Sequence, residues 1–536
     1  MRILLRAQRL LSVVVIIRAA KIIESFMEYS KPTILAQSAI MMADCQKKPC
    51  GRPSCTRKPS GTPFLEKMTV RSLPYIIYRS YPDFGYLTDN RNYGYDTSSH
   101  SCMKVGDLLL SKVASLFYSV LSCTPQDIDS IVDKLCQLFP GELRSTLRED
   151  AIHFYSDLSI KGFVCFDNNI SNSRLSYFSY ENRNFFDLSL SSHQLEESTY
   201  LDTLARTCQL QRVHIDISGK CNENCIHCYI PNNKKCGVMS LDLFEHILYQ
   251  CKELNVINLT ISGGEPMLNP YLIDFLRQCK QHNFSVNILS NLTMLSDELL
   301  DEFVGNPLIS VQTSLYAMDE QIHDMITRNK GSFKKTLNSI ELLHGKNIPM
   351  QINCPIMKQN LRYYKDVLIY AKSKNIEADS DYSLFGSFDC SKKNLACRLS
   401  IEEISELLLN SSDETEKRNE FNFKNKDSRT EICPVCKTSL CVSNSGDIYP
   451  CEGWQSMVLG NINNHSLKSI WEESPQVKYL RELTFGNFPK CVNCEDKNFC
   501  SPCLIMNANE DCNADYEKIN PFTCSVASLK KQAATL

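Results

Sequence analysis

The sequence crowds three cysteines and one histidine into the segment CNENCIHC, residues 221–228. Cys221, Cys225 and Cys228 follow the spacing CxxxCxxC and come shortly after the run VHIDIS, whose alternating apolar residues predict a β-strand. Three thiolates held in one loop at this spacing can ligate three irons of a 4Fe–4S cluster and leave the fourth iron without a protein ligand. Such an iron is an open chemical site.

Cysteine is the unusual feature of the composition. Of the 27 cysteines, 13 fall in three groups, at 221–228, 433–451 and 491–524. Short gaps favour metal binding, because neighbouring thiolates can converge on one ion or cluster, whereas a disulfide framework is typical of short secreted chains. Metal binding is therefore the preferred interpretation of these groups, and disulfide bonding is the alternative.

The overall charge points to neither nucleic acid nor a membrane surface as the partner. The 536 residues include 58 Lys and Arg against 61 Asp and Glu, which gives a net charge of -3. A hydrophobic content of 43% is ample for the cores of an ordinary globular chain. The partner must therefore be inferred from the sites.

Residues 1–67 are basic and poorly patterned. The apolar run Leu10–Ile17 is too short to span a bilayer, and no clear cleavage signal follows it. We expect residues 1–67 to be a disordered or mis-assigned extension, with Met68 as an alternative start. A targeting segment is the other interpretation.

Residues 68–167 predict a small α+β module. Strands are expected at 73–80, 84–89 and 92–97, and helices at 105–121, 125–139 and 148–163. The module carries no catalytic group that the pattern reveals. It is therefore either a structural cap or a recognition domain with an exposed sheet edge.

After a polar linker at 168–207, residues 208–400 alternate strand and helix patterns as βα units do. The expected strands are 213–218, 256–262, 285–290, 308–315, 349–356 and 377–385, and the expected helices 240–254, 271–282, 297–304, 331–345 and 361–375. The pattern predicts an α/β fold with a partial (β/α)6 barrel, whose active site forms at the carboxyl ends of the strands. The CxxxCxxC loop follows the first strand, where such a site is expected.

Polar and glycine-rich segments follow the next strands. The motif SGGEP at 262–266 comes after the second strand, where two glycines allow close backbone approach and Glu265 offers a negative charge. Ser290 and Asn291 follow the third strand, Ser314 lies at the end of the fourth, and Arg328 precedes a GSF helix start. Taken singly, each has an ordinary interpretation as a turn, a loop residue or a solvated charge.

In this order, these features resemble the radical S-adenosylmethionine (SAM) enzymes over roughly residues 208–390. The resemblance implies a 4Fe–4S cluster on Cys221, Cys225 and Cys228, which when reduced cleaves SAM to a 5'-deoxyadenosyl radical that abstracts hydrogen from the substrate. The implied cofactor-binding residues are Tyr229, Gly263, Gly264, Glu265, Pro266, Ser290, Asn291, Ser314 and Arg328.

The resemblance also suggests individual roles. It assigns the glycine-rich motif to the methionine amino group, Ser290 and Asn291 to the ribose, and Arg328 to the carboxylate, which a guanidinium can grip through two hydrogen bonds. One position departs from the family pattern: His227 stands where many relatives have an aromatic residue before the third cysteine. We expect it to pack beside the adenine, and we assign no catalytic residue beyond the cluster and cofactor.

Past a linker at 401–432, residues 433–536 resemble the cysteine-rich SPASM extension, which houses two auxiliary 4Fe–4S clusters. The implied ligands are Cys433, Cys436, Cys451 and Cys503 for the first, and Cys491, Cys494, Cys500 and Cys524 for the second. Cys441 and Cys512 stay open as substitutes. Zinc is the alternative to iron, because CxxC pairs favour tetrahedral zinc.

By its pattern, the module at 68–167 resembles the winged-helix-like, PqqD-like domains that bind the leader of ribosomally made precursor peptides. The resemblances together imply a RiPP peptide maturase, an oxidoreductase that abstracts hydrogen from a precursor peptide and installs an intrapeptide crosslink, expected to be a thioether. The alternatives are a formylglycine-generating sulfatase maturase, a carbon–carbon crosslinking cyclase, and a non-catalytic iron–sulfur protein that binds peptides or senses redox state.

The same resemblances imply the partners and setting. A flavodoxin- or ferredoxin-type protein is the expected electron donor, with no nucleic acid and no membrane as partner. Because air-exposed thiolate clusters do not last, an anaerobic cytoplasm is the expected location.

Overall fold

The computed structural model describes residues 68–94, 105–167, 208–409 and 425–535. The expected extension at 1–67 and the linker at 168–207 lie outside the described residues. Within them, no helix has the length and apolar character needed to cross a bilayer.

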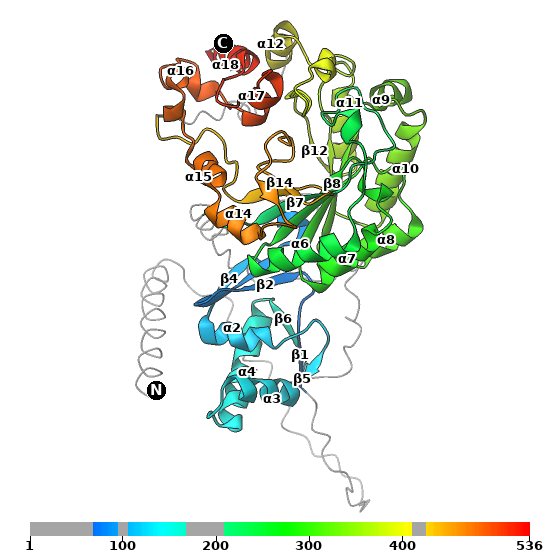
Figure 1. Cartoon of the computed structure of the whole chain (residues 1–536). Helices are drawn as coiled ribbons and strands as arrows, with labels where there is room; N and C mark the ends of the chain where they lie inside the picture. The colour runs from blue at the N-terminus through cyan, green and yellow to red at the C-terminus, as the bar shows by residue number, and fades with distance from the viewer. Residues whose placement is uncertain (1–67, 95–104, 168–207, 410–424, 536) are drawn as a thin grey trace, which may run out of the picture. The chain divides into compact units, whose positions relative to one another are not determined.

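Six parallel strands form the central sheet, and all six were predicted from the sequence (Figure 1). They lie in chain order, each paired with the next: β7 (Arg212–Ser218), β8 (Asn258–Gly263), β9 (Ser285–Leu289), β10 (Ile309–Ser314), β11 (Met350–Asn353) and β12 (Glu377–Asp379). On β7, Val213, Ile215 and Ile217 are fully buried in the main core. The residues between them face the opposite side of the sheet, because side chains alternate along a strand.

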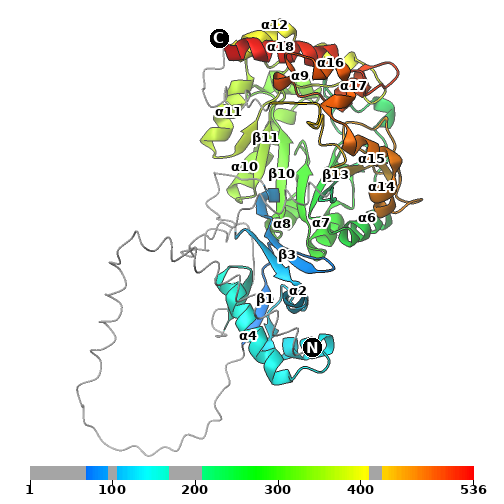
Figure 2. The same cartoon turned by 90° about the vertical axis from the view of Figure 1, so that its left-hand side faces the viewer.

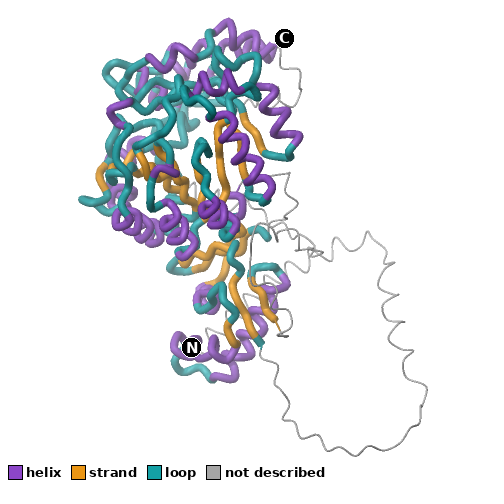
Figure 3. The backbone as a smooth tube through the Cα atoms, turned by 90° about the vertical axis from the view of Figure 1, so that its right-hand side faces the viewer, coloured by secondary structure: helices purple, strands orange, loops and turns teal. Residues whose placement is uncertain are grey.

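Helices connect and cover these strands, as Figure 3 shows with helices in purple around strands in orange. They are α6 (Leu241–Glu253), α7 (Leu272–Gln281), α8 (Asp297–Val304), α9 (Glu320–Thr327), α10 (Ser332–Gly345) and α11 (Tyr364–Ser373). Ser240, Ser296 and Asp319 cap α6, α8 and α9 by accepting backbone N–H hydrogen bonds. The sequence pattern missed α9, an eight-residue helix between β10 and α10.

The C-terminal region extends the same sheet instead of forming a separate one. Strand β13 (Ser439–Val442) pairs in parallel with β7, and β14 (Asp447–Tyr449) and β15 (Gly460–Asn461) follow as antiparallel strands. The sheet therefore has nine strands. The remaining helices of this region are α14 (Leu467–Glu473), α15 (Pro475–Glu482), α16 (Pro489–Val492), α17 (Leu504–Glu510) and α18 (Pro521–Thr535).

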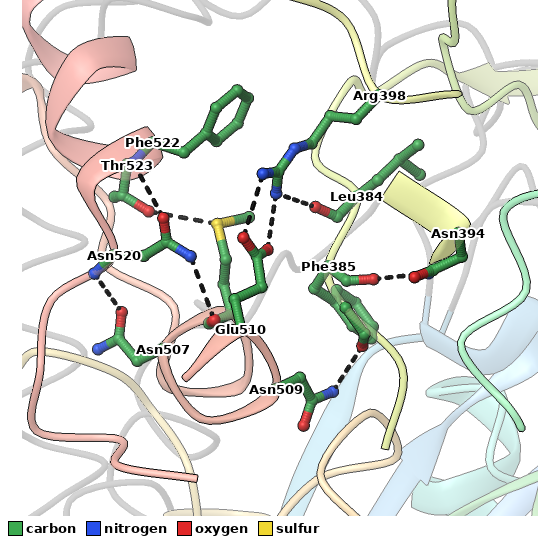
Figure 4. Close-up of polar contacts among 12 residues, drawn as sticks. Leu384, Phe385, Asn394, Arg398, Asn507, Asn509, Glu510, Asn520, Phe522 and Thr523 are labelled. Atoms are coloured by element: carbon green, nitrogen blue, oxygen red, sulfur yellow. Dashed lines mark hydrogen bonds and ion pairs between the residues drawn. The ribbon is translucent and has the colours of Figure 1, made fainter. Parts of the chain in front are cut away.

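Buried polar contacts fasten this region to the far end of the barrel (Figure 4). Arg398 forms a bidentate ion pair with Glu510, whose carboxylate oxygens lie 2.6 and 3.1 Å from the guanidinium nitrogens. The guanidinium carbon lies 4.0 Å from the ring centre of Phe522. Asn509 donates to the carbonyls of Gly386 and Gly453. Helix α12 (Ile401–Leu409), within the segment expected as a linker, packs along α18 (Figure 2).

In its described residues, the N-terminal module contains two small sheets and three α-helices. One sheet has the strand order β5 (Gln126–Asp127), β1 (Thr69–Ser72), β6 (Val164–Asp167), and the other β2 (Ile76–Ser80), β3 (Phe84–Asp89), β4 (Asp107–Ser111). The helices are α2 (Lys112–Ser119), α3 (Ile128–Leu138) and α4 (Arg144–Ile160). A winged-helix-like identity for this module stays a prediction.

One predicted strand of this module is wrong. Residues 92–94 of the expected strand at 92–97 belong to the 3-10 helix Arg91–Gly94, and the rest of that segment is outside the described residues. The third strand is instead β4, which takes residues expected to begin a helix. The run DLLLS is too short for its periodicity to distinguish a helix from a strand. Its pairing with residues 84–88 of β3 makes it a strand.

Arg79 joins the module to the base of the barrel. Its fully buried guanidinium donates to the carbonyls of Val256, at 2.7 Å, and Asn283, at 2.9 Å, just before β8 and β9. The Asn283 side chain also bonds the backbone of β2, accepting from the Tyr78 N–H and donating to the Ile76 carbonyl. Burial lowers the pKa of Arg79 to about 10, so the side chain is still charged at neutral pH.

Replacing Arg79 should weaken the whole protein. We expect Arg79→Met to lower the free energy of unfolding by about 3 kcal/mol or more, because two buried carbonyls lose their donor at roughly 1–3 kcal/mol each. Arg144→Ala, at a half-exposed arginine with surface ion pairs, should lower the stability far less, because exposed ion pairs are screened by solvent. Denaturant unfolding followed by circular dichroism measures both, and equal losses would contradict the anchoring role.

Candidate functional site

A cavity of about 220 Å³ lies at the carboxyl ends of the central strands, where the barrel pattern predicted the site. The CxxxCxxC loop and the ends of β8, β9, β10 and β11 contribute its walls. The lining residues that carry the argument below are Cys221, Glu223, Cys225, His227, Cys228, Tyr229, Gly263, Gly264, Ser290, Asn291, Thr313, Ser314 and Asn353.

The three predicted cysteines share this cavity. The end of α9 holds their loop in place, since Asn224 N–H donates to the Thr327 carbonyl at 3.1 Å and Ile226 N–H to the Ile326 carbonyl at 2.9 Å. Burial raises the pKa of Cys221 to about 11 and that of Cys225 further. These thiols are therefore neutral without a metal, and cluster binding must displace their protons.

The glycine-rich loop touches the strand that carries the cysteines. Gly264 N–H donates to the Ser218 carbonyl at 2.7 Å, and Glu265 N–H to the Lys220 carbonyl at 2.8 Å. A Cβ atom on Gly263 would lie 2.1 Å from the Ser218 carbonyl oxygen, and its φ of +125° is one that other residues rarely adopt. Side chains cannot enter this contact, which explains the two glycines.

Glu265 is fully buried and faces the protein. One carboxylate oxygen accepts from Ser290 Oγ at 2.7 Å and Met267 N–H at 3.0 Å, and the other from Asn291 N–H at 2.8 Å. Burial raises its pKa, and these three bonds oppose the rise. Glu265 thus ties the end of β8 to the end of β9, while its predicted contact with the cofactor stays a prediction.

The other predicted cofactor residues divide into two groups. Tyr229, Ser290, Asn291 and Ser314 line the cavity together with the two glycines. Pro266 is buried next to Glu265, and Arg328 is exposed in a left-handed conformation after α9. Neither lies among the residues that line the cavity.

Several lining residues were not predicted, and some carry buried oxygens without a bonding partner. They are Glu223 Oε1, Thr313 Oγ1 and Asn353 Oδ1. Thr313 and Asn353 stand at the ends of β10 and β11, so position alone marks them as candidates, as it marked Ser314. A bound molecule with several hydrogen-bonding groups would satisfy these oxygens, so the residues present fit a polar cofactor.

His227 packs edge-on against Tyr316, with ring centres 5.2 Å apart, and its Nε2 lies 3.4 Å from the Tyr316 hydroxyl. Burial lowers the pKa of His227 to about 4, so the imidazole is neutral. Its Nδ1 is buried without a partner. This placement agrees with a packing role beside a bound cofactor, which stays a prediction.

The charges of the C-terminal cysteines act on one another in two sets. Burial raises the pKa of Cys433, and the charge of Cys503 adds to the rise, as it does for Cys451. Burial raises the pKa of Cys436 to about 12, with a contribution from Cys433. That these four cysteines hold one cluster stays a prediction.

The second set includes Cys524. Burial raises the pKa of Cys500 to about 12, with added contributions from Cys524, Cys491 and Cys494. Cys512 is exposed and adds instead to the raised pKa of Cys390. Cys524 as the fourth ligand of the second cluster, in place of Cys512, stays a prediction.

Comparison with known proteins matches both regions. Residues 215–371 match the radical SAM superfamily, and residues 433–495 match SPASM, an iron–sulfur cluster-binding domain. The chain contains a radical SAM domain and a SPASM domain. These domains indicate SAM and 4Fe–4S clusters as its cofactors. The residue types present fit these cofactors, because three cysteines line the cavity of the radical SAM domain and the SPASM region is rich in cysteine.

Curated relatives align with about half of this chain. The AdoMet-dependent heme synthase of Methanosarcina barkeri is 24% identical over 54% of this chain and 89% of its own length. The subtilosin biosynthesis protein AlbA of Bacillus subtilis is 24% identical over 55% of this chain and 67% of its own length. The PqqA peptide cyclase of Bradyrhizobium diazoefficiens is 21% identical over 53% of this chain and 78% of its own length.

A solved structure shows the same fold over most of the chain. SuiB of Streptococcus suis, in a crystal structure bound to its precursor peptide SuiA, is 15% identical with a TM-score of 0.50. The match covers 84% of this chain and 99% of SuiB. At this identity the likeness establishes the arrangement of the backbone.

Enlarging the glycine at the contact between β7 and β8 should impair SAM binding. We expect Gly263→Ala to weaken SAM binding about tenfold or more, since a forced positive φ costs roughly 1–3 kcal/mol and tenfold corresponds to about 1.4 kcal/mol. Gly345→Ala at the end of α10, where a Cβ atom meets nothing within 4 Å, is the control. Equilibrium dialysis with labelled SAM measures both.

The radical SAM cysteines should be separable from the others. We expect simultaneous Cys221→Ala, Cys225→Ala and Cys228→Ala changes to abolish reductive cleavage of SAM while leaving the SPASM clusters in place, because the two ligand sets lie on different segments. Chromatography of 5'-deoxyadenosine and iron analysis test this pair of outcomes. Continued SAM cleavage would contradict the assignment.

Cys524 and Cys512 should differ in iron binding. We expect the reconstituted chain to hold about twelve irons in three clusters. Cys524→Ala should lower this by up to about four irons, because one ligand of the second SPASM cluster is lost, and Cys512→Ala should leave it unchanged. Iron analysis with Mössbauer spectroscopy measures both variants; the opposite order would exchange the two assignments.

Proposed function

We propose that this chain is a radical SAM enzyme that abstracts hydrogen from a ribosomally made precursor peptide and installs an intrapeptide thioether crosslink. When bound, SAM and the reduced cluster supply the hydrogen-abstracting chemistry. The main support for this reaction class is that the three-cysteine loop and the glycine-rich loop line the same cavity.

The residues of the chain have distinct tasks in this proposal. Cys221, Cys225 and Cys228 hold the radical SAM cluster, and the remaining cavity wall orients SAM against it. Burial raises the pKa of Glu223 to about 7, so the carboxyl beside Cys225 is about half protonated near neutral pH.

A peptide substrate is supported by the relatives and by the N-terminal module. Two of the three curated relatives carry names that refer to peptides, the bacteriocin subtilosin and the peptide PqqA. In the module, Asn283 of the barrel bonds the outer edge of β2, whereas β4 pairs only with β3 among the described residues. The edge of β4, flanked by exposed Leu109 and Val113, is therefore the surface to which we assign the leader peptide.

The SPASM cysteines complete the proposal. Cys433, Cys436, Cys451 and Cys503 hold one auxiliary cluster, and Cys491, Cys494, Cys500 and Cys524 the other. A flavodoxin- or ferredoxin-type protein supplies electrons, because reductive cleavage of SAM consumes one electron in each event.

The direct test combines the reconstituted enzyme with SAM, a reductant and candidate precursor peptides from open reading frames that flank the gene. A thioether crosslink removes a pair of hydrogen atoms from the peptide and protects one cysteine from alkylation, and tandem mass spectrometry detects both changes. SAM cleavage without any change in the peptides would refute the proposed substrates. A mass loss with every cysteine still alkylated would replace the thioether with another crosslink.

Charge on the edge of β4 should separate peptide binding from SAM cleavage. We expect the double variant Leu109→Glu and Val113→Glu to weaken binding of the precursor peptide about tenfold or more, since each loses apolar contact area worth about 1.5 kcal/mol or more when buried. Ile369→Glu, at an exposed apolar residue on α11, is the control. Fluorescence anisotropy measures binding, and SAM cleavage should be unchanged in both proteins. Equal peptide binding by the double variant and the control would contradict the assignment of the leader peptide to this edge.

A further inference from the structure

A second group of metal-ligating side chains lies on the central sheet and shares no residue with the ligand sets assigned above to the three clusters. It consists of His214, Asp216 and Cys441. His214 and Asp216 share one face of β7 because side chains alternate along a strand, and Cys441 on β13 stands opposite His214 in the parallel pairing. Sheet register alone therefore brings the three side chains together.

The donor atoms are close enough for one ion. His214 Nε2 lies 3.0 Å from Asp216 Oδ1, Cys441 Sγ lies 4.0 Å from Asp216 Oδ2, and ligand atoms of all three residues lie within 4.8 Å of one another. The side chains of His214 and Asp216 are each 14% exposed, and Cys441 is buried. The cysteines of the radical SAM loop do not form a group this close.

A neighbouring residue holds the carboxylate in position. Gln455 Nε2 donates to Asp216 Oδ2 at 2.9 Å, from the loop that follows Cys451. Outer contacts of this kind orient a metal-ligating carboxylate. Glu452, on the same loop, adds a second carboxylate whose charge acts on both His214 and Cys441. The surroundings are thus negative, and a divalent cation would offset that charge.

The donor types select the metal. One imidazole, one carboxylate and one thiolate suit zinc, which accepts nitrogen, oxygen and sulfur in tetrahedral sites, whereas magnesium and calcium prefer oxygen alone. We propose that His214, Asp216 and Cys441 bind one Zn²⁺ ion, with the fourth position taken by water. Three protein ligands and an exchangeable one are typical of zinc sites that take part in chemistry rather than purely structural sites. This inference rests on the side chains alone and does not depend on the peptide substrate.

The test uses the reconstituted full chain with its iron–sulfur clusters. After equilibration with buffered zinc, elemental analysis should find about one zinc per chain, and X-ray absorption at the zinc edge should show one sulfur donor with nitrogen and oxygen donors. That signature excludes zinc misplaced in the cysteine groups, which would show four sulfur donors. Absence of bound zinc, or an all-sulfur zinc signature, would overturn the inference.

Variants distinguish ligation from general damage. Cys441→Ser and Asp216→Asn should each abolish zinc binding without lowering iron content, and Gln455→Ala should weaken zinc binding about 10- to 100-fold. Cys279→Ala is the matched control, because it removes another buried cysteine, on α7, far from any proposed ligand set in the sequence. If Cys441→Ser fails to fold, Asp216→Asn preserves the shape of the side chain and decides the question. Unchanged zinc affinity in Asp216→Asn would contradict the site.

Discussion

The structure depends on a backbone contact that no side chain can enter. At the end of β7, the carbonyls of Ser218 and Lys220 accept from the N–H groups of Gly264 and Glu265, and Cβ atoms on Gly263 or Gly264 would lie within 2.1–2.5 Å of those same carbonyl oxygens. This contact fixes where the cysteine loop leaves the sheet. Because Glu265 in turn binds Ser290 and Asn291, the ends of three strands are locked in one arrangement around the cavity. The cysteine loop therefore faces strand ends whose positions are already fixed by hydrogen bonds.

The sequence predicted the parts of the fold whose pattern is local. All six parallel strands of the barrel were expected because their apolar residues form short runs between turn residues, and the cavity was expected because parallel strands end at one side of the sheet. The CxxxCxxC cysteines and the first three residues of SGGEP line that cavity, along with Ser290, Asn291 and Ser314. The prediction therefore succeeds for elements whose conformation is set by their own residues.

The misses have a different physical origin. Strand β4 was taken for the start of a helix, since DLLLS has no periodicity of its own and gains its conformation from pairing with β3. The addition of β13 to β7 joins residues more than two hundred positions apart, which no local pattern encodes. Thr313 and Asn353 carry no motif, and their unsatisfied buried oxygens, which set them apart from other residues at strand ends, are visible only in the folded chain. Pairing between distant strands and the absence of hydrogen-bond partners can be recognised only in the folded structure.

The late arrival of β13 has a consequence for synthesis of the chain. Strand β7 leaves the ribosome long before β13, and at roughly 5–20 residues per second its edge waits on the order of tens of seconds for its partner. An open edge strand invites pairing with other nascent chains, and inward-facing charged side chains are one means by which proteins suppress such pairing. His214 and Asp216 lie on this strand, where an unbroken apolar run would be sticky. Because it carries polar side chains, this face of β7 favours such pairing less than an unbroken apolar strand does.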